Sequence, residues 1–108
     1  MDTTNNARTI SQRVEDQMMT VYDPEFPVVD IRTLGLIRDF TPDEEKRHIH
    51  FLMTFTTPAC PMGEMIEQMV DNAIIEEFPG WTTSIELTFD PLWSPKDIKD
   101  EDLQKMFS

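Results

Sequence analysis

One succession in the chain, a strand followed by a helix and then a second strand, restricts the fold more than any other feature. Residues 47–55 alternate between apolar and polar side chains, as a half-buried strand does. Residues 62–78 then carry apolar side chains at the spacing of an amphipathic helix, which Pro79 and Gly80 end. Residues 82–89 alternate again. Such a succession predicts a right-handed crossover, in which the two strands lie parallel in one sheet.

The remaining segments predict a two-layer α/β sandwich of the order α-β-β-α-β-α, with a small mixed sheet of about three strands covered by helices. Apolar side chains at helical spacing predict a first helix from Arg8 that ends before Pro24. Residues 34–40 predict a strand that forms an antiparallel hairpin with residues 47–55. A short final helix is expected over about residues 100–107, and it is expected to pack Leu103, Met106 and Phe107.

Two prolines within residues 23–30 favour a stiff extended or turn segment over a helix or a central strand. This segment carries Asp23 and Glu25, and a rigid loop holds such side chains still at little further cost in entropy. A simpler interpretation is that Asp23 caps a turn and that Glu25 is solvated.

Length and charge limit the classes of protein that this chain can represent. The 108 residues predict one domain over residues 8–108 after a polar, disordered segment at residues 1–7. The chain has 21 acidic and 9 basic residues, and a net charge of −12 argues against nucleic acid or an anionic membrane as partner. The acidic surface would suit a basic protein partner, although solubility is the simpler explanation. With no secretory signal, no apolar run near the ~20 residues that span a bilayer and a single cysteine, we expect a cytoplasmic protein.

Cys60 is the only cysteine, and it stands between the second predicted strand and the long predicted helix. Pro61 suits the first position of that helix, which would place Cys60 at the N-cap or beside it. Unpaired backbone N–H groups and the helix dipole both favour the thiolate there, which is the form that ligates soft metals. A buried, inert cysteine at a helix start fits the composition equally well.

Several familiar thiol and phosphate chemistries lack their residues in this chain. A thiol-disulfide oxidoreductase normally uses a second cysteine, and the three glycines are too scattered for a phosphate-binding loop. His48 and His50 precede Cys60 on a strand, so they are poorly placed as a base for the thiol. They lie two residues apart on the face opposite the apolar set, within reach of one metal ion, but a solvated strand face explains them without a metal.

What remains is one activated thiol flanked by Thr56 and Thr57, with Asp23 and Glu25 on a stiff segment that can fold over it. This set suits transient capture of a soft metal or a cluster, with the other ligands supplied by a second protomer or by a client protein.

Four segments at a specific spacing carry a resemblance to a known family. They are Asp23–Ile31, Leu34–Ile37, Thr56–Met62 and Asp90–Pro95. Over residues 10–107 the chain resembles the SufT and PaaD-like family of metal–sulfur cluster assembly factors, whose domain is shared with the eukaryotic cytosolic iron–sulfur targeting factor.

The resemblance implies a small two-layer α/β domain that helps to assemble iron–sulfur clusters or to target them to proteins. It implies that Cys60 is the reactive or cluster-contacting residue and that Asp23, Glu25, Thr56 and Thr57 line the same site. A transient iron–sulfur cluster or iron would be bound, without being required for folding. Partners would be other assembly proteins and apo-client proteins, and a homodimer is a further expectation.

Alternatives stay open at this point. The first loop resembles the PaaD branch, which serves a phenylacetyl-CoA oxygenase. Two departures weigh against that branch. SufT-type members also have Thr-Thr-Pro before Ala-Cys-Pro, as at residues 56–61 here, and the cysteine-bearing C-terminal extension of PaaD does not follow residue 107. Leu92 stands where many members have proline. A thiol-dependent persulfide or sulfur carrier is the alternative from the enzyme class, and an adaptor in which Cys60 is incidental is a third. We expect an assembly or carrier factor rather than an enzyme.

Overall fold

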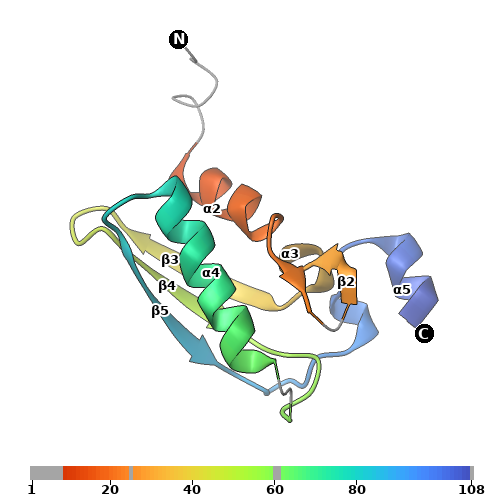
Figure 1. The fold of residues 1–108 in the computed structure, drawn as a ribbon. Helices are drawn as coiled ribbons and strands as arrows, with labels where there is room; N and C mark the ends of the chain where they lie inside the picture. The colour runs from red at the N-terminus through yellow and green to blue at the C-terminus, as the bar shows by residue number, and fades with distance from the viewer. Residues whose placement is uncertain (1–8, 25, 60–61, 108) are drawn as a thin grey trace.

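The computed structural model describes residues 9–24, 26–59 and 62–107 of the chain. Helices and strands follow one another as α2 (Ile10–Met18), β1 (Tyr22–Asp23), β2 (Phe26–Asp30), α3 (Ile31–Leu34), β3 (Ile37–Asp43), β4 (His48–Met53), α4 (Gly63–Glu77), β5 (Thr82–Leu87), the 3-10 helix η1 (Pro95–Asp97) and α5 (Glu101–Phe107) (Figure 1). No helix in this part of the chain is long and apolar enough to cross a bilayer.

Three strands form the main sheet, in the order β3-β4-β5. Strands β3 and β4 are antiparallel, whereas β4 and β5 are parallel, with His48 opposite Thr82 and Met53 opposite Leu87. Helix α4 crosses from β4 to β5 over one face of the sheet, and α2 lies on the same side (Figure 1). The predicted mixed sheet, the crossover and the two-layer α/β class are therefore confirmed.

The core lies between the sheet and this helical layer. Ile49, Phe51 and Met53 alternate along β4 and are fully buried, as the period of two requires. They meet an equally buried stripe of α4 that consists of Ile66, Val70 and Ile74. Burying each such side chain stabilises the fold by about 1.5–3 kcal/mol.

The segment before the main sheet is more structured than the sequence indicates. Strands β1 and β2 form a two-stranded antiparallel sheet, where the sequence predicts only a stiff segment. Asp30 then caps α3, because its Oδ1 accepts the Thr33 N–H at 2.8 Å. Gly35 ends α3 with φ +88°, so the strand predicted from Leu34 begins only at Ile37.

The starts of two helices also differ from the expectation. Helix α2 begins at Ile10, because Thr9 and Gln12 form a capping box, and Arg8 lies outside the described residues. Helix α4 begins at Gly63 with Met62 as its N-cap, so the prediction of Pro61 as the first helical position is wrong by two residues.

Helix α5 confirms the predicted packing only in part. Leu103 packs against the core, but Met106 is 79% exposed, so the prediction that Met106 is packed is wrong. The physical reason is that α5 lies beyond the end of the sheet (Figure 1), where η1 is the element that it contacts. The side chain of Phe107 lies outside the described residues.

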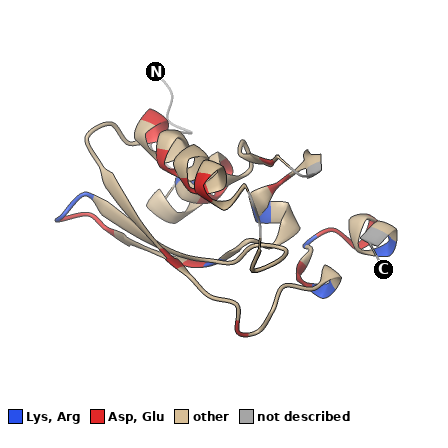
Figure 2. Ribbon diagram, turned by 60° about the horizontal axis from the view of Figure 1, so that its bottom comes forward, with Lys and Arg blue, Asp and Glu red and all other residues tan. Residues whose placement is uncertain are grey.

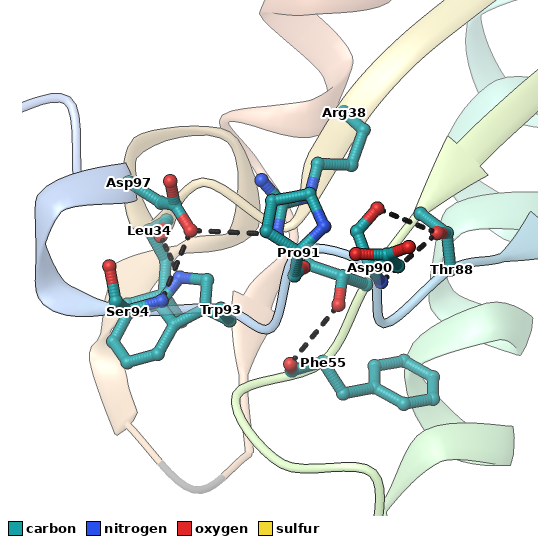
Figure 3. A network of polar contacts seen from close by, with 10 residues as sticks. Leu34, Arg38, Phe55, Thr88, Asp90, Pro91, Trp93, Ser94 and Asp97 are labelled. Atoms are coloured by element: carbon teal, nitrogen blue, oxygen red, sulfur yellow. Dashed lines mark hydrogen bonds and ion pairs between the residues drawn. The ribbon is translucent and has the colours of Figure 1, made fainter.

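The segment after β5 binds back onto α3 and β3. Trp93 donates its indole N–H to the carbonyl of Leu34 at 2.8 Å, and Arg38 donates to the carbonyl of Pro91 at 2.9 Å (Figure 3). Arg38 also pairs with Asp97 at 3.5 Å (Figure 3). These bonds hold the end of the chain against the start of β3.

Gly35 is required by this arrangement, and Gly80 provides a matched control. Both have positive φ, +88° and +87°, but a Cβ on Gly35 would collide with the backbone carbonyl of Asp97, whereas one on Gly80 would meet nothing within 4 Å. Gly80→Ala should therefore lower the free energy of unfolding by about 1–2 kcal/mol, from backbone strain alone. Gly35→Ala should lower it by about 2–5 kcal/mol, because overpacking adds to the strain. Urea denaturation of both variants checks this, and equal losses would contradict the proposed contact.

Candidate functional site

The loops that follow β4 and β5 leave the sheet at the same end, because the two strands are parallel and finish side by side. The Thr88 N–H donates to the carbonyl of Met53 at 2.8 Å, which continues the parallel ladder to the ends of both strands. Beyond it, the rings of Phe55 and Phe89 lie with centroids 6.2 Å apart. The prediction that both loops leave from the carboxyl end of the sheet is confirmed. Open α/β sheets commonly bind ligands at this end.

The base of the loop after β4 is fixed on two sides. Thr54 is fully buried, and its N–H donates to the carbonyl of Leu36 at 2.9 Å, which ties the loop to the start of β3. Phe55 is buried against the first residue of α4, since a Cβ on Gly63 would lie 2.7 Å from Cε2 of the Phe55 ring. The chain is thus anchored at both ends of the short stretch that contains Cys60.

Three of the predicted site residues lie in the described part of the chain. Thr56 is half-buried and Thr57 is exposed, both in the loop after β4, where the Thr57 hydroxyl accepts the Ala59 N–H at 3.3 Å. Asp23 ends β1 in the separate two-stranded sheet. Cys60 and Glu25 lie outside the described residues.

Asp23 is 1% exposed, a burial that the sequence did not indicate. Carboxylates are rarely buried without a hydrogen-bonding or charged partner, so a fully buried aspartate has a specific structural or chemical role. Sequence reasoning missed this because a segment with two prolines resembles a surface loop. Figure 1 shows the β1-β2 hairpin at the same end of the molecule as the loop after β4, away from the β3–β4 turn.

The two histidines belong to a chain of hydrogen bonds across β4 and β5, on the face of the sheet opposite the core. His48 Nδ1 lies 2.7 Å from the Thr82 hydroxyl, and His48 Nε2 lies 2.9 Å from the Ser84 hydroxyl. The same hydroxyl lies 2.6 Å from His50 Nδ1, and His50 Nε2 lies 3.2 Å from Glu86 Oε1. The sequence shows that residues 82, 84 and 86 are polar and share one face of their strand. Only the register between β4 and β5 shows that these side chains lie beside the two histidines.

This arrangement engages every ring nitrogen of both histidines with a side chain on β5. They are therefore poorly available as a base for a thiol on the loop after β4. Among residues 9–24, 26–59 and 62–107, no group of three or more His, Cys, Asp or Glu side chains is placed to hold a metal ion.

Known proteins that resemble this chain are concerned with iron–sulfur clusters. A protein of Porphyromonas gingivalis named Fe-S protein maturation auxiliary factor is 36% identical over 79% of this chain and 78% of its own length. The chloroplastic Fe-S cluster assembly factor HCF101 of Arabidopsis thaliana is 29% identical over 76% of this chain, but the chain spans only 15% of that relative's length.

Solved structures share the fold over nearly the whole chain. A conserved hypothetical protein of Thermotoga maritima matches with a TM-score of 0.78 and 32% identity over 94% of this chain and 96% of its own. The family described as iron-sulfur cluster assembly protein matches residues 11–87, which is more than half of the chain. These matches confirm the resemblance seen in the sequence: the chain belongs to the family of iron–sulfur cluster assembly proteins.

Proposed function

We propose that this protein helps to assemble iron–sulfur clusters, or to target them to apo-proteins, by offering Cys60 as a transient contact for a cluster or its iron. The observation that carries the proposal is the anchored loop after β4, which Thr54 ties to β3 and Phe55 ties to Gly63 of α4. Because the base of the loop is fixed, we expect its thiol to be offered near the carboxyl ends of β4 and β5.

One cysteine can supply only one of the ligands that such a cluster needs. Iron–sulfur clusters are usually held by four protein ligands, so the others would come from the partner that delivers or receives the cluster. The cluster is then cargo, passed on because a single thiolate holds it weakly. The names of the relatives, which describe assembly and maturation of Fe-S proteins, support this role.

The other residues of the site are proposed to surround this contact. Thr56 and Thr57 belong to the same loop as Cys60, and their hydroxyls are suited to donate hydrogen bonds to sulfur or to a partner. Asp23, which is buried at the end of β1, and Glu25, two residues later in the sequence, are proposed to line the same site. We propose other assembly proteins and apo-clients as the partners.

Replacement of Cys60 tests the central claim. Cys60→Ala should lower the rate of cluster transfer to an apo-ferredoxin at least about tenfold after anaerobic reconstitution with iron and sulfide, because an alanine offers no ligand. Visible absorbance follows the transfer, and Cys60→Ser serves as the isosteric control. If both variants transfer the cluster as fast as the unaltered protein, the proposed role of Cys60 is wrong. In a separate incubation with a low-molecular-weight persulfide, which can pass its outer sulfur to a thiol, retention of one added sulfur atom on Cys60 in the mass spectrum, without cluster transfer, would favour a persulfide carrier.

Displacement of the loop base tests the role of the anchor while Cys60 stays in place. In Gly63→Ala the added methyl meets the Phe55 ring, which is buried and contacts Phe89, so the ring has little room to move. We expect a loss of about 1–3 kcal/mol in unfolding free energy, together with slower cluster transfer at a temperature where the variant is folded.

Gly80→Ala is the control for that variant, because it lies beyond the opposite end of α4 and loses stability without touching the loop. It should transfer cluster at the rate of the unaltered protein. Equal transfer by Gly63→Ala and Gly80→Ala would show that the position of the loop does not matter.

A further inference from the structure

We propose that the free edge of β5 and the acidic side of α4 form a docking groove for an extended, basic segment of a partner protein, which adds to the sheet as a fourth strand. Its use in cluster delivery rests on the proposed function, but the docking itself is a separate property of the fold.

The first observation is an open strand edge. Within the described residues, β5 pairs with β4 alone, and it forms the outer margin of the sheet (Figure 1). The N–H groups of Thr82 and Thr88 both donate towards β4, to the carbonyls of Arg47 and Met53. Because this direction alternates along a strand, the N–H and C=O groups of Thr83, Ile85 and Leu87 point away from β4. They are spaced to pair with an added strand.

The second observation is that this edge lacks three features that commonly block such pairing, and its one charged residue, Glu86, is hydrogen-bonded to His50 of β4. Natural edge strands are commonly protected by lysine, proline or a bulge. At the other edge of the sheet, β3 contains Pro42 and a register shift between Ile37 and Asp39. The sequence of β5, TTSIEL, contains no lysine or proline, and its register with β4 is regular throughout.

The third observation is an acidic groove that runs along this edge. It has a volume of about 400 Å³, and α4 and β5 supply its lining: Glu64, Glu67, Gln68, Asp71, Thr83 and Ile85. None of these lining residues is Lys or Arg. Asp71 accepts a hydrogen bond from the Thr83 hydroxyl at 2.8 Å, which fixes the helix relative to the strand. Figure 2 shows acidic residues recurring along α4.

Charge complementarity selects the occupant. A segment with Lys or Arg at alternate positions would direct these side chains to the α4 carboxylates while its backbone pairs with β5. A second copy of this chain is disfavoured, because pairing two β5 edges would bring two acidic rows of α4 together. The groove therefore fits a basic, proline-free segment of another protein.

The test uses synthetic peptides rather than an unknown partner. A capped hexapeptide with alternating Lys and Val is titrated into the 15N-labelled protein, beside a Glu–Val peptide and a Lys–Val peptide N-methylated on alternate residues. We expect the first peptide to shift the amide signals of Thr83, Ile85 and Leu87 and to slow their hydrogen exchange. The other two should bind at least about tenfold more weakly, because one has the wrong charge and the other cannot pair.

Protein variants supply the matched control. Glu64→Lys, in the groove, should weaken binding of the Lys–Val peptide about tenfold. Glu76→Lys makes the same charge change on an exposed residue of the same helix outside the groove, and it should weaken binding much less. The proposal would be overturned if Glu64→Lys and Glu76→Lys weakened binding equally, or if the N-methylated peptide bound as tightly as the unmethylated one. Amide shifts confined to residues away from β5 would also overturn it. Self-association through β5 in sedimentation would overturn it too.

None of these measurements involves a cluster. Loss of the docking proposal would leave the cluster-transfer test of Cys60 unaffected, and failure of that test would leave a peptide-binding edge in place.

Discussion

The parallel pairing of β4 with β5 is the interaction on which the rest of the structure depends. Two parallel neighbours cannot be joined by a tight turn, so α4 must cross the sheet between them, and its apolar stripe then supplies the core. Because of the same pairing, the two loops that follow these strands start at the same end of the sheet, where the rings of Phe55 and Phe89 are in contact. Because β5 follows the crossover and no described strand pairs beyond it, its outer edge is left open.

The two proposals use different consequences of that pairing. In the sequence Cys60 follows Thr54 and Phe55, which are held against β3 and α4, and precedes Gly63, the first residue of α4, and we propose it as the contact point for a cluster. The groove beside β5 combines an unblocked strand edge with the carboxylates of α4, which suits a basic segment of a partner. A factor that receives a cluster and passes it on needs both a contact for the cargo and a surface that recognises the protein at the other end of the transfer.

Prediction from sequence succeeded where the local pattern of apolar residues is compatible with only one type of secondary structure. The alternation in β4 and the long stripe of α4 led directly to the mixed sheet, and the four family segments led to the family. It failed where a short segment depends on a cap: α3 exists because Asp30 and Gly35 bound it, and α4 starts two residues late. It also failed for Met106, since a helical stripe shows which side chains share a face but not whether anything covers that face.

The sequence by itself determined the order of the three main strands and of helices α2, α4 and α5, the parallel crossover, and the one residue able to act as a thiolate ligand, because these follow from periodicity, proline and glycine positions and composition. Its four motif segments indicated the family. Only the tertiary structure decided that Asp23 is buried, that His48 and His50 share the hydroxyl of Ser84, and that β5, beside acidic side chains, pairs with a strand of the described residues on one side only. These features depend on register and packing between residues far apart in the chain, and no local pattern specifies which side chains are brought together.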